Sequence, residues 1–328
     1  MTRVLTGLQP SGILHIGNYF GAIEPMIQLQ ATSEMLMFIP DYHAITVPQR
    51  PDELRRNILF ATAVYLAAGI DPKKTLLFPQ SMVPQHTELG WILNCIAHMG
   101  ELERMTQFKD KSTGKGEAVS VGLFAYPILM AADILLYDTL LVPVGADQKQ
   151  HVELARDLAL RFNKTFGETF VVPEPMIRKQ GARIMGLDNA EKKMSKSASS
   201  PKNYISLMDD AETVVKKIKA AVTDSGTEVK SSPDRPALTN LLSIFSLVTG
   251  KKVAEIETEY IDKNYGTFKE DLAHAVNVWL VPLQAKINTY LKDEAGLIKI
   301  LEEGAAQARE RAEAKMKIVR RKIGVALS

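Results

Sequence analysis

Two short segments carry residues that could bind and activate a phosphate group. The first, residues 10–18 (PSGILHIGN), joins a glycine-containing turn to the start of an expected helix. A helix N-terminus offers N–H groups and a partial positive charge to an anion. Gly17 permits close approach of an adenine or ribose to the backbone, and His15 and Asn18 could donate hydrogen bonds to an α-phosphate. An ordinary strand-to-helix turn with a surface histidine remains an alternative.

The second segment, residues 192–197 (KKMSKS), places three lysines among hydroxyl groups. Lysine is a compact point charge that suits a pyrophosphate leaving group. We therefore predict catalytic roles for Lys193, Ser195 and Lys196, against the alternative of a solvated basic loop.

Asp133 stands in an apolar segment, beside Met130 and Ile134. A buried carboxylate is costly unless a hydrogen-bond donor meets it. It either pairs with a backbone group or an arginine in the core, or it accepts a hydrogen bond from a substrate. An indole has one polar atom, which is a donor, so a single buried acceptor would recognise it.

Alternating strands and helices must position these residues. We expect strands at residues 3–8, 35–39, 75–78 and 140–144, and helices that begin near residues 16, 51 and 148. This order predicts an α/β fold, a Rossmann-like doubly wound parallel sheet, whose ligands bind beyond the carboxyl ends of the strands. The loops at residues 9–12 and 145–148 follow two of those ends.

The sequence pattern changes from alternating strands and helices to helices alone after about residue 201. Segments 209–223, 238–247, 267–290 and 297–323 have helical patterns. We therefore expect a catalytic domain over residues 1–202 and an all-helical domain over residues 203–328, whose last helix could pack back on the first domain.

Composition places no strong restriction on partners. The net charge is +2, from 40 basic and 38 acidic residues, so an RNA partner would need a local basic face. The single cysteine, Cys95, suits a reducing cytoplasm. The apolar stretch 119–145 contains two aspartates and two prolines, so we expect a buried helix and strand there, with no membrane span.

The two phosphate-binding segments, in this order, resemble the paired signatures of class I aminoacyl-tRNA synthetases. The lysine signature matches at every residue, whereas Asn18 stands where the first signature usually ends in histidine. This asparagine is common in the tryptophanyl branch, in which many bacterial members have threonine at the position of His15. Segments 7–12, 100–109, 126–135, 143–151 and 181–185 are also similar to that branch.

The resemblance implies binding sites for ATP and for tryptophan. The implied ATP-binding residues are Gln9, Pro10, Ser11, Gly17, Asn18, Gly145, Ala146, Asp147, Ile184, Lys193, Met194, Ser195, Lys196, Ser197 and Lys111. The implied tryptophan-binding residues are Asp133, Met130, Tyr126, Gln148 and His43. Tyr126 and Gln148 could instead cap nearby backbone. His43 could be a satisfied loop histidine, and Lys111 could lie in a solvated loop.

Met130 bears on the choice of amino acid. The tyrosyl enzymes of this subclass tend to have glutamine three residues before the matching aspartate, on the same face of the helix. Methionine packs an indole and offers no amide to a phenol. The sequence thus favours tryptophan, with a tyrosyl enzyme and a synthetase-like protein that does not charge tRNA as alternatives.

The implied reaction joins L-tryptophan to tRNA(Trp) through an adenylate, with Mg²⁺ accompanying ATP. No cluster of cysteine and histidine has zinc-binding spacing.

We also expect a homodimer, in which an apolar face of Leu89, Ile92, Leu93 and Ile96 either meets the partner or is buried within the chain. A basic stretch near the C-terminus either contacts tRNA or forms a solvated helix face. It contains Arg309, Arg311, Lys315, Lys317, Arg320, Arg321 and Lys322.

Overall fold

The computed structural model describes residues 1–10, 12–112, 119–145, 148–177, 183–196, 198 and 200–327. Its centre is a parallel sheet of five short strands, in the order β3-β2-β1-β4-β5. The strands are β1 (Arg3–Gly7), β2 (Glu34–Ile39), β3 (Thr75–Pro79), β4 (Leu141–Val144) and β5 (Glu174–Ile177). The predicted α/β fold with a parallel sheet is confirmed, and β5 is a strand that the sequence pattern did not indicate.

Helices cover both faces of this sheet, because successive residues of a strand point to opposite sides. In β2, Met35 and Met37 pack into one core and Leu36 and Phe38 into another. The helices of the sheet region are α1 (Ile16–Asn18), α2 (Glu24–Leu29), α3 (Asp41–Ala44), α4 (Pro51–Ala68), α5 (Gln85–Asn94), α6 (Met99–Glu103), α7 (Thr106–Ser112), α8 (Val121–Leu135) and α9 (Lys149–Phe166). Shorter turns are the π-helix η1 (Tyr19–Ile23) and the 3₁₀ helices η2 (Gln80–Met82) and η5 (Pro201–Asn203).

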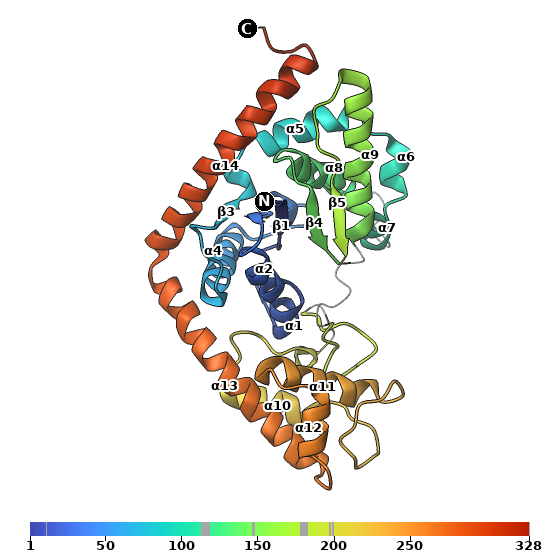
Figure 1. Cartoon of the computed structure of the whole chain (residues 1–328), viewed down its shortest axis with the longest axis vertical. Coiled ribbons are helices and arrows are strands. Elements are labelled where there is room, and N and C mark those ends of the chain that lie inside the picture. The colour runs from blue at the N-terminus through green and yellow to red at the C-terminus, as the bar shows by residue number, and fades with distance from the viewer. Residues whose placement is uncertain are drawn as a thin grey trace.

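The region after η5 is helical in the described part of the chain. Its helices are α10 (Ala211–Ala220), α11 (Pro236–Thr249), α12 (Val253–Glu259), α13 (Tyr265–Lys292) and α14 (Glu294–Lys322). Figure 1 shows α10–α12 gathered at one end of the molecule, while α13 and α14 form an arm along its side. The apolar stretch 119–145 supplies α8 and β4, as expected. No helix in the described ranges has both the length and the apolar character that crossing a membrane requires.

The strand at one edge of the sheet, β3, is covered by α14. The two elements pack closely at Gly304, where an added Cβ would overlap the backbone carbonyl of Leu77. An edge strand otherwise exposes unpaired backbone groups. The last helix therefore covers this edge of the sheet from one side (Figure 1).

The basic stretch of α14 faces the chain itself. Arg311 contacts Glu34 at 2.5 Å, Lys315 contacts Asp138 at 2.5 Å, and Arg320 contacts Glu88 at 2.6 Å. Arg309 donates a hydrogen bond to the carbonyl of Met82. Lys317, Arg321 and Lys322 remain exposed. Arg311, Lys315 and Arg320 are thus used within the chain, because charge spacing alone does not reveal which acidic residues fold against a basic helix.

The apolar face proposed for a dimer is also used largely within the chain. Leu89 and Leu93 are completely buried, and Ile92 and Ile96 pack partly against the same core. The large apolar side chains exposed nearby are Trp91, Met99 and Val121. Helical spacing identified an apolar face correctly but could not tell an internal core from an interface.

We expect Gly304→Ala to lower the free energy of unfolding by about 1–3 kcal/mol, the usual cost of overpacking. The new methyl group must move α14 away from β3, and the higher helix propensity of alanine does not compensate. Gly122→Ala is the control, because among the described residues the nearest atom to its Cβ would be Ser120 Oγ, at 3.8 Å. Urea unfolding that shows Gly304→Ala to be as stable as the control would contradict the close packing.

Candidate functional site

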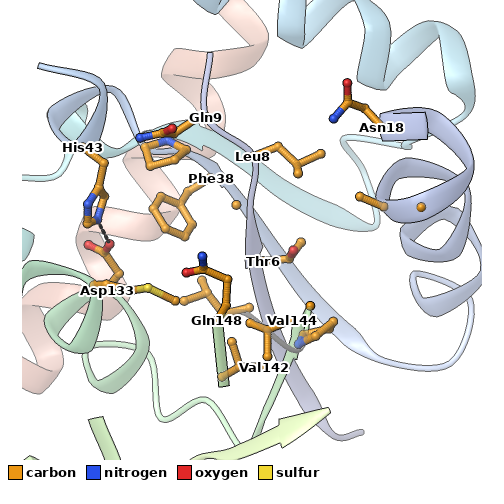
Figure 2. A pocket seen from close by; sticks show the side chains of 18 of the residues that line it. Thr6, Leu8, Gln9, Asn18, Phe38, His43, Asp133, Val142, Val144 and Gln148 are labelled. Carbon is orange, nitrogen blue, oxygen red and sulfur yellow. Dashed lines mark hydrogen bonds and ion pairs between the residues drawn. The ribbon is translucent and has the colours of Figure 1, made fainter. Parts of the chain in front are cut away.

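A cavity of about 860 Å³ opens where the sheet reverses its winding, between β1 and β4. Crevices at this position hold ligands in open α/β sheets. Figure 2 shows His43 and Asp133 on one side of β1 and Asn18 on the other. The predicted site residues that line the cavity are Gln9, Gly17, Asn18, His43, Tyr126, Met130, Asp133, Gly145, Gln148 and Lys193. The cavity therefore brings most of both predicted groups together.

The side of the cavity where we predicted phosphate binding, called the phosphate side below, is built on the first turn of α1. Gly12 adopts a left-handed φ of +82°, which glycine tolerates without strain. The His15 N–H donates to Asn18 Oδ1 at 3.1 Å, so Asn18 holds the start of the helix. Gly17 leaves room for the His15 ring, whose Nδ1 would lie 2.9 Å from an added Cβ. These contacts fix the turn that a phosphate would approach.

The lysine segment lies against this turn through a buried methionine. Met194 is packed in the core, and its N–H donates to the carbonyl of Ile184 at 3.0 Å. Lys193 and Lys196, on either side, are exposed, and Lys193 lines the cavity. The side chains of Met194 and Ile184 thus anchor the segment, which leaves only their backbone atoms to meet a nucleotide.

Two asparagines that the sequence did not single out support the lysine segment. Asn203 Oδ1 accepts from the Ser195 N–H at 2.9 Å. Asn240, on α11, accepts from the Met185 N–H at 2.8 Å and donates to its carbonyl at 3.0 Å. Side-chain amides that satisfy a neighbouring loop have no distinctive sequence spacing, so only the fold could identify them.

The electrostatics of this side favour an anion. Burial, together with nearby Lys193 and Lys196, lowers the pKa of His15 to about 4. Lys196 is exposed overall, but partial desolvation of its ammonium group lowers its pKa below the ordinary value. His15 is therefore neutral at pH 7 and can both donate and accept a hydrogen bond.

The opposite side of the cavity is organised around Asp133, which is completely buried on α8. His43 Nε2 lies 2.9 Å from Oδ2, while Gln80 Nε2 and His86 Nδ1 lie 2.7 and 2.6 Å from Oδ1. Burial alone would raise the pKa of this carboxyl, but the two histidines, through their hydrogen bonds and through their positive charge when protonated, lower it to about 2. Asp133 is thus an ionised acceptor. Its partners are histidine and glutamine side chains, where the sequence had suggested a backbone group or an arginine.

Tyr126 and Gln148 also border the cavity. The Tyr126 hydroxyl lies 3.0 Å from His151 Nε2, and burial raises the pKa of Tyr126 to about 12, so the phenol stays protonated. In Figure 2 the amide of Gln148 lies between Asp133 and Val144. Both side chains are placed where a polar group of a bound molecule could reach them.

The remaining predicted residues fall outside the cavity lining or outside the described residues. Pro10 is buried behind the first turn, and Ser195 and Lys196 lie beyond Lys193 in the lysine segment. Lys111 falls within α7, but its side chain is outside the described part. Outside the described residues lie Ser11, Ala146, Asp147 and Ser197.

Comparisons with known proteins agree with this geometry. Residues 1–281 match the family model described as tRNA synthetases class I (W and Y). The chain is 51% identical over 328 residues to the tryptophan–tRNA ligase of Caldanaerobacter subterraneus, covering all of this chain and 99% of that protein. The structure of a tryptophanyl-tRNA synthetase from Mycoplasma pneumoniae superposes with a TM-score of 0.89 and 36% identity, over 99% of this chain and 98% of that one. One from Campylobacter jejuni, complexed with ADP and tryptophan, has a TM-score of 0.86 and 44% identity, over 98% and 100% of the two chains.

The low pKa of His15 predicts a pH dependence of stability. An unfolded histidine titrates at 6.5 and the folded one at about 4, so between these values only the unfolded state gains the proton. The free energy of unfolding should therefore be unaffected by His15 above pH 6.5 and should fall as the pH drops toward 4. His15→Gln should lose less stability than the wild type across this window in urea unfolding. If the free energy of unfolding fell equally with pH in the wild type and in His15→Gln, the prediction would be contradicted.

Proposed function

The chain belongs to the class I tRNA synthetases of the tryptophan and tyrosine family, and we propose that it attaches L-tryptophan to tRNA(Trp). One observation supports tryptophan as the amino acid. The apolar side of the cavity presents one buried, ionised acceptor, Asp133, with Met130 one helical turn before it. An indole N–H can satisfy such an acceptor, and the rest of the ring is apolar. The full-length likeness to tryptophan–tRNA ligases supports the same choice.

The first step joins tryptophan and ATP. A carboxylate oxygen of tryptophan attacks the α-phosphorus, the bond to the bridging oxygen breaks, and pyrophosphate leaves. ATP enters as its magnesium complex. His15 and Asn18 stabilise charge on the α-phosphate, and Lys193 and Lys196 stabilise the departing pyrophosphate, with Ser195 among them. Catalysis consists of positioning and charge stabilisation, without a covalent intermediate on the protein.

The remaining contacts hold the two substrates. Tyr126 and Gln148 bind the α-ammonium group of tryptophan, and His43 borders its ring beside Asp133. The first turn and the lysine segment bind the nucleotide. The predicted residues are Gln9, Pro10, Ser11, Gly17, Gly145, Ala146, Asp147, Ile184, Met194, Ser197 and Lys111. The presence of cavity-lining members from both groups supports this arrangement.

The second step transfers the amino acid to tRNA. A terminal hydroxyl of tRNA(Trp) attacks the acyl carbonyl, and AMP leaves. We propose that residues 203–328 contain the surface for the anticodon stem and loop. Since much of the basic stretch of α14 is paired with the catalytic region, the helices α10–α12 at the far end of the molecule are the better candidates (Figure 1). The reaction fits the cytoplasm, where ATP and tRNA are available.

Exchange of labelled pyrophosphate into ATP tests this function. We expect exchange with tryptophan and none with tyrosine, followed by acylation of a tRNA(Trp) transcript. Exchange that depends on tyrosine would support the tyrosyl alternative. Absence of exchange with both amino acids would indicate a protein that does not charge tRNA.

A second prediction concerns Asp133→Asn. The amide keeps the shape but is a weaker acceptor, and a hydrogen bond to a charged group contributes roughly 1.5–3 kcal/mol. We expect kcat/KM for tryptophan to fall about tenfold or more, with a smaller preference over phenylalanine, which has no side-chain donor. The KM for ATP should hardly change. Equal proportional losses for both amino acids, together with a lower melting temperature, would indicate a structural role only.

A third prediction concerns assembly. Trp91, Met99 and Val121 are exposed on α5, α6 and α8, and both α5 and α6 pack on α8. We propose that they contribute to the interface of a homodimer, where burial of their large apolar side chains would be favourable. Sedimentation equilibrium at micromolar concentration should give twice the mass of 36.3 kDa. A monomer mass would refute the dimer.

A further inference from the structure

His86 lies deep behind the amino-acid side of the cavity and is itself completely buried. It is the second residue of α5, and its ring joins two other buried groups. Nδ1 lies 2.6 Å from Asp133 Oδ1, and Nε2 lies 2.8 Å from the Tyr137 hydroxyl. An ionised carboxylate only accepts, so Nδ1 must carry a proton. In the neutral ring, Nε2 then accepts from the Tyr137 O–H, so both ring nitrogens of His86 have a partner.

The donors to Asp133 restrict what else it can bind. A carboxylate has about four acceptor positions. Gln80 and His86 occupy both positions on Oδ1, and His43 occupies one on Oδ2. In the described part of the chain this leaves a single position on Oδ2, in a residue that lines the cavity. One remaining acceptor position matches one indole N–H.

Holding the Asp133 carboxylate leaves one polar atom of Gln80 without a hydrogen-bond partner among the described residues. Its Nε2 donates to Asp133, while its buried Oε1 has no donor among the described residues. A buried acceptor without a partner is unfavourable. The amide nevertheless faces Asp133 with its nitrogen, so the need to hold the carboxylate determines its orientation.

The segment that carries Gln80 and His86 is anchored from the outside. Arg309 of α14 donates to the carbonyl of Met82, and Gln85 donates to Glu313 at 3.0 Å. Arg320 makes two hydrogen bonds of 2.6 Å to Glu88. Three contacts from α14 therefore surround the short stretch that supplies the donors. His86 is therefore held by Asp133 and Tyr137 at its ring, and by the contacts of α14 at the segment that carries it.

We propose that His86, held by Tyr137, is a positioning residue for amino-acid recognition. It touches no substrate and acts through Asp133, by fixing the carboxylate so that one acceptor position faces the indole. This inference rests on the proposed tryptophan activation.

Two substitutions of His86 separate positioning from packing. The side-chain amide nitrogen of asparagine, a donor, can occupy the place of Nδ1, and the side-chain amide oxygen of glutamine, an acceptor, can occupy the place of Nε2. His86→Asn therefore keeps a donor for Asp133, whereas His86→Gln keeps the partner of Tyr137 and loses that donor. Both remove the ring from the same site, so each is the matched control for the other.

In pyrophosphate exchange, we expect His86→Gln to raise the KM for tryptophan about tenfold. Its preference for tryptophan over phenylalanine should shrink, and its KM for ATP should stay unchanged. His86→Asn should remain closer to the wild type on both measures at a similar melting temperature. Equal effects of the two variants, in proportion to lost thermal stability, would overturn the proposal.

Tyr137→Phe provides a second test in case a His86 variant does not fold. It keeps the imidazole but removes the hydroxyl that holds Nε2. We expect a several-fold rise in the KM for tryptophan with little change for ATP, and wild-type values for both would contradict the role of His86. If the wild type itself shows no tryptophan-dependent exchange, the proposed function fails, and that result is distinct from failure of a variant.

Discussion

A single buried negative charge imposes the strongest constraint on this structure. Asp133 has no exposed surface, and a carboxylate without donors would be very costly there. The donors come from His43, after β2, from Gln80, directly after β3, and from His86 at the start of α5. Parallel strands end at the same edge of the sheet, so the fold can deliver two of these groups to one point.

The segments that hold Asp133 are in turn held by each other and by the last helix, α14. Asp41, beside His43, accepts a hydrogen bond from the N–H of Ser81, beside Gln80, at 2.9 Å. The two donor segments are thereby tied to each other, and α14 holds the second one from outside the sheet. The amino-acid side of the cavity is accordingly a rigid assembly of helices and strand ends. The phosphate side depends more on a loop, the lysine segment, that Met194 anchors.

Much of this could be predicted from the sequence, because the α/β alternation, the glycine-containing turn and the lysine segment are local patterns. The anchoring residues Gln80, His86, Asn203 and Asn240 could not be predicted, since an ordinary polar side chain gains its role only from a distant partner. Strand β5 was missed because the sequence Glu174–Ile177 is short and contains a proline. The sequence left open the location of Leu89, Leu93 and the arginines of α14, because apolar and basic periodicity do not reveal which surface covers them.

The central claim is that Asp133 recognises the indole N–H. The most direct measurement compares tryptophan with β-(3-benzothienyl)alanine, in which sulfur replaces the N–H group while the ring shape is nearly retained. The wild type should use tryptophan with a kcat/KM about tenfold or more higher in pyrophosphate exchange, and Asp133→Asn should lose most of that difference. Equal kcat/KM values for the two amino acids in the wild type would contradict the account.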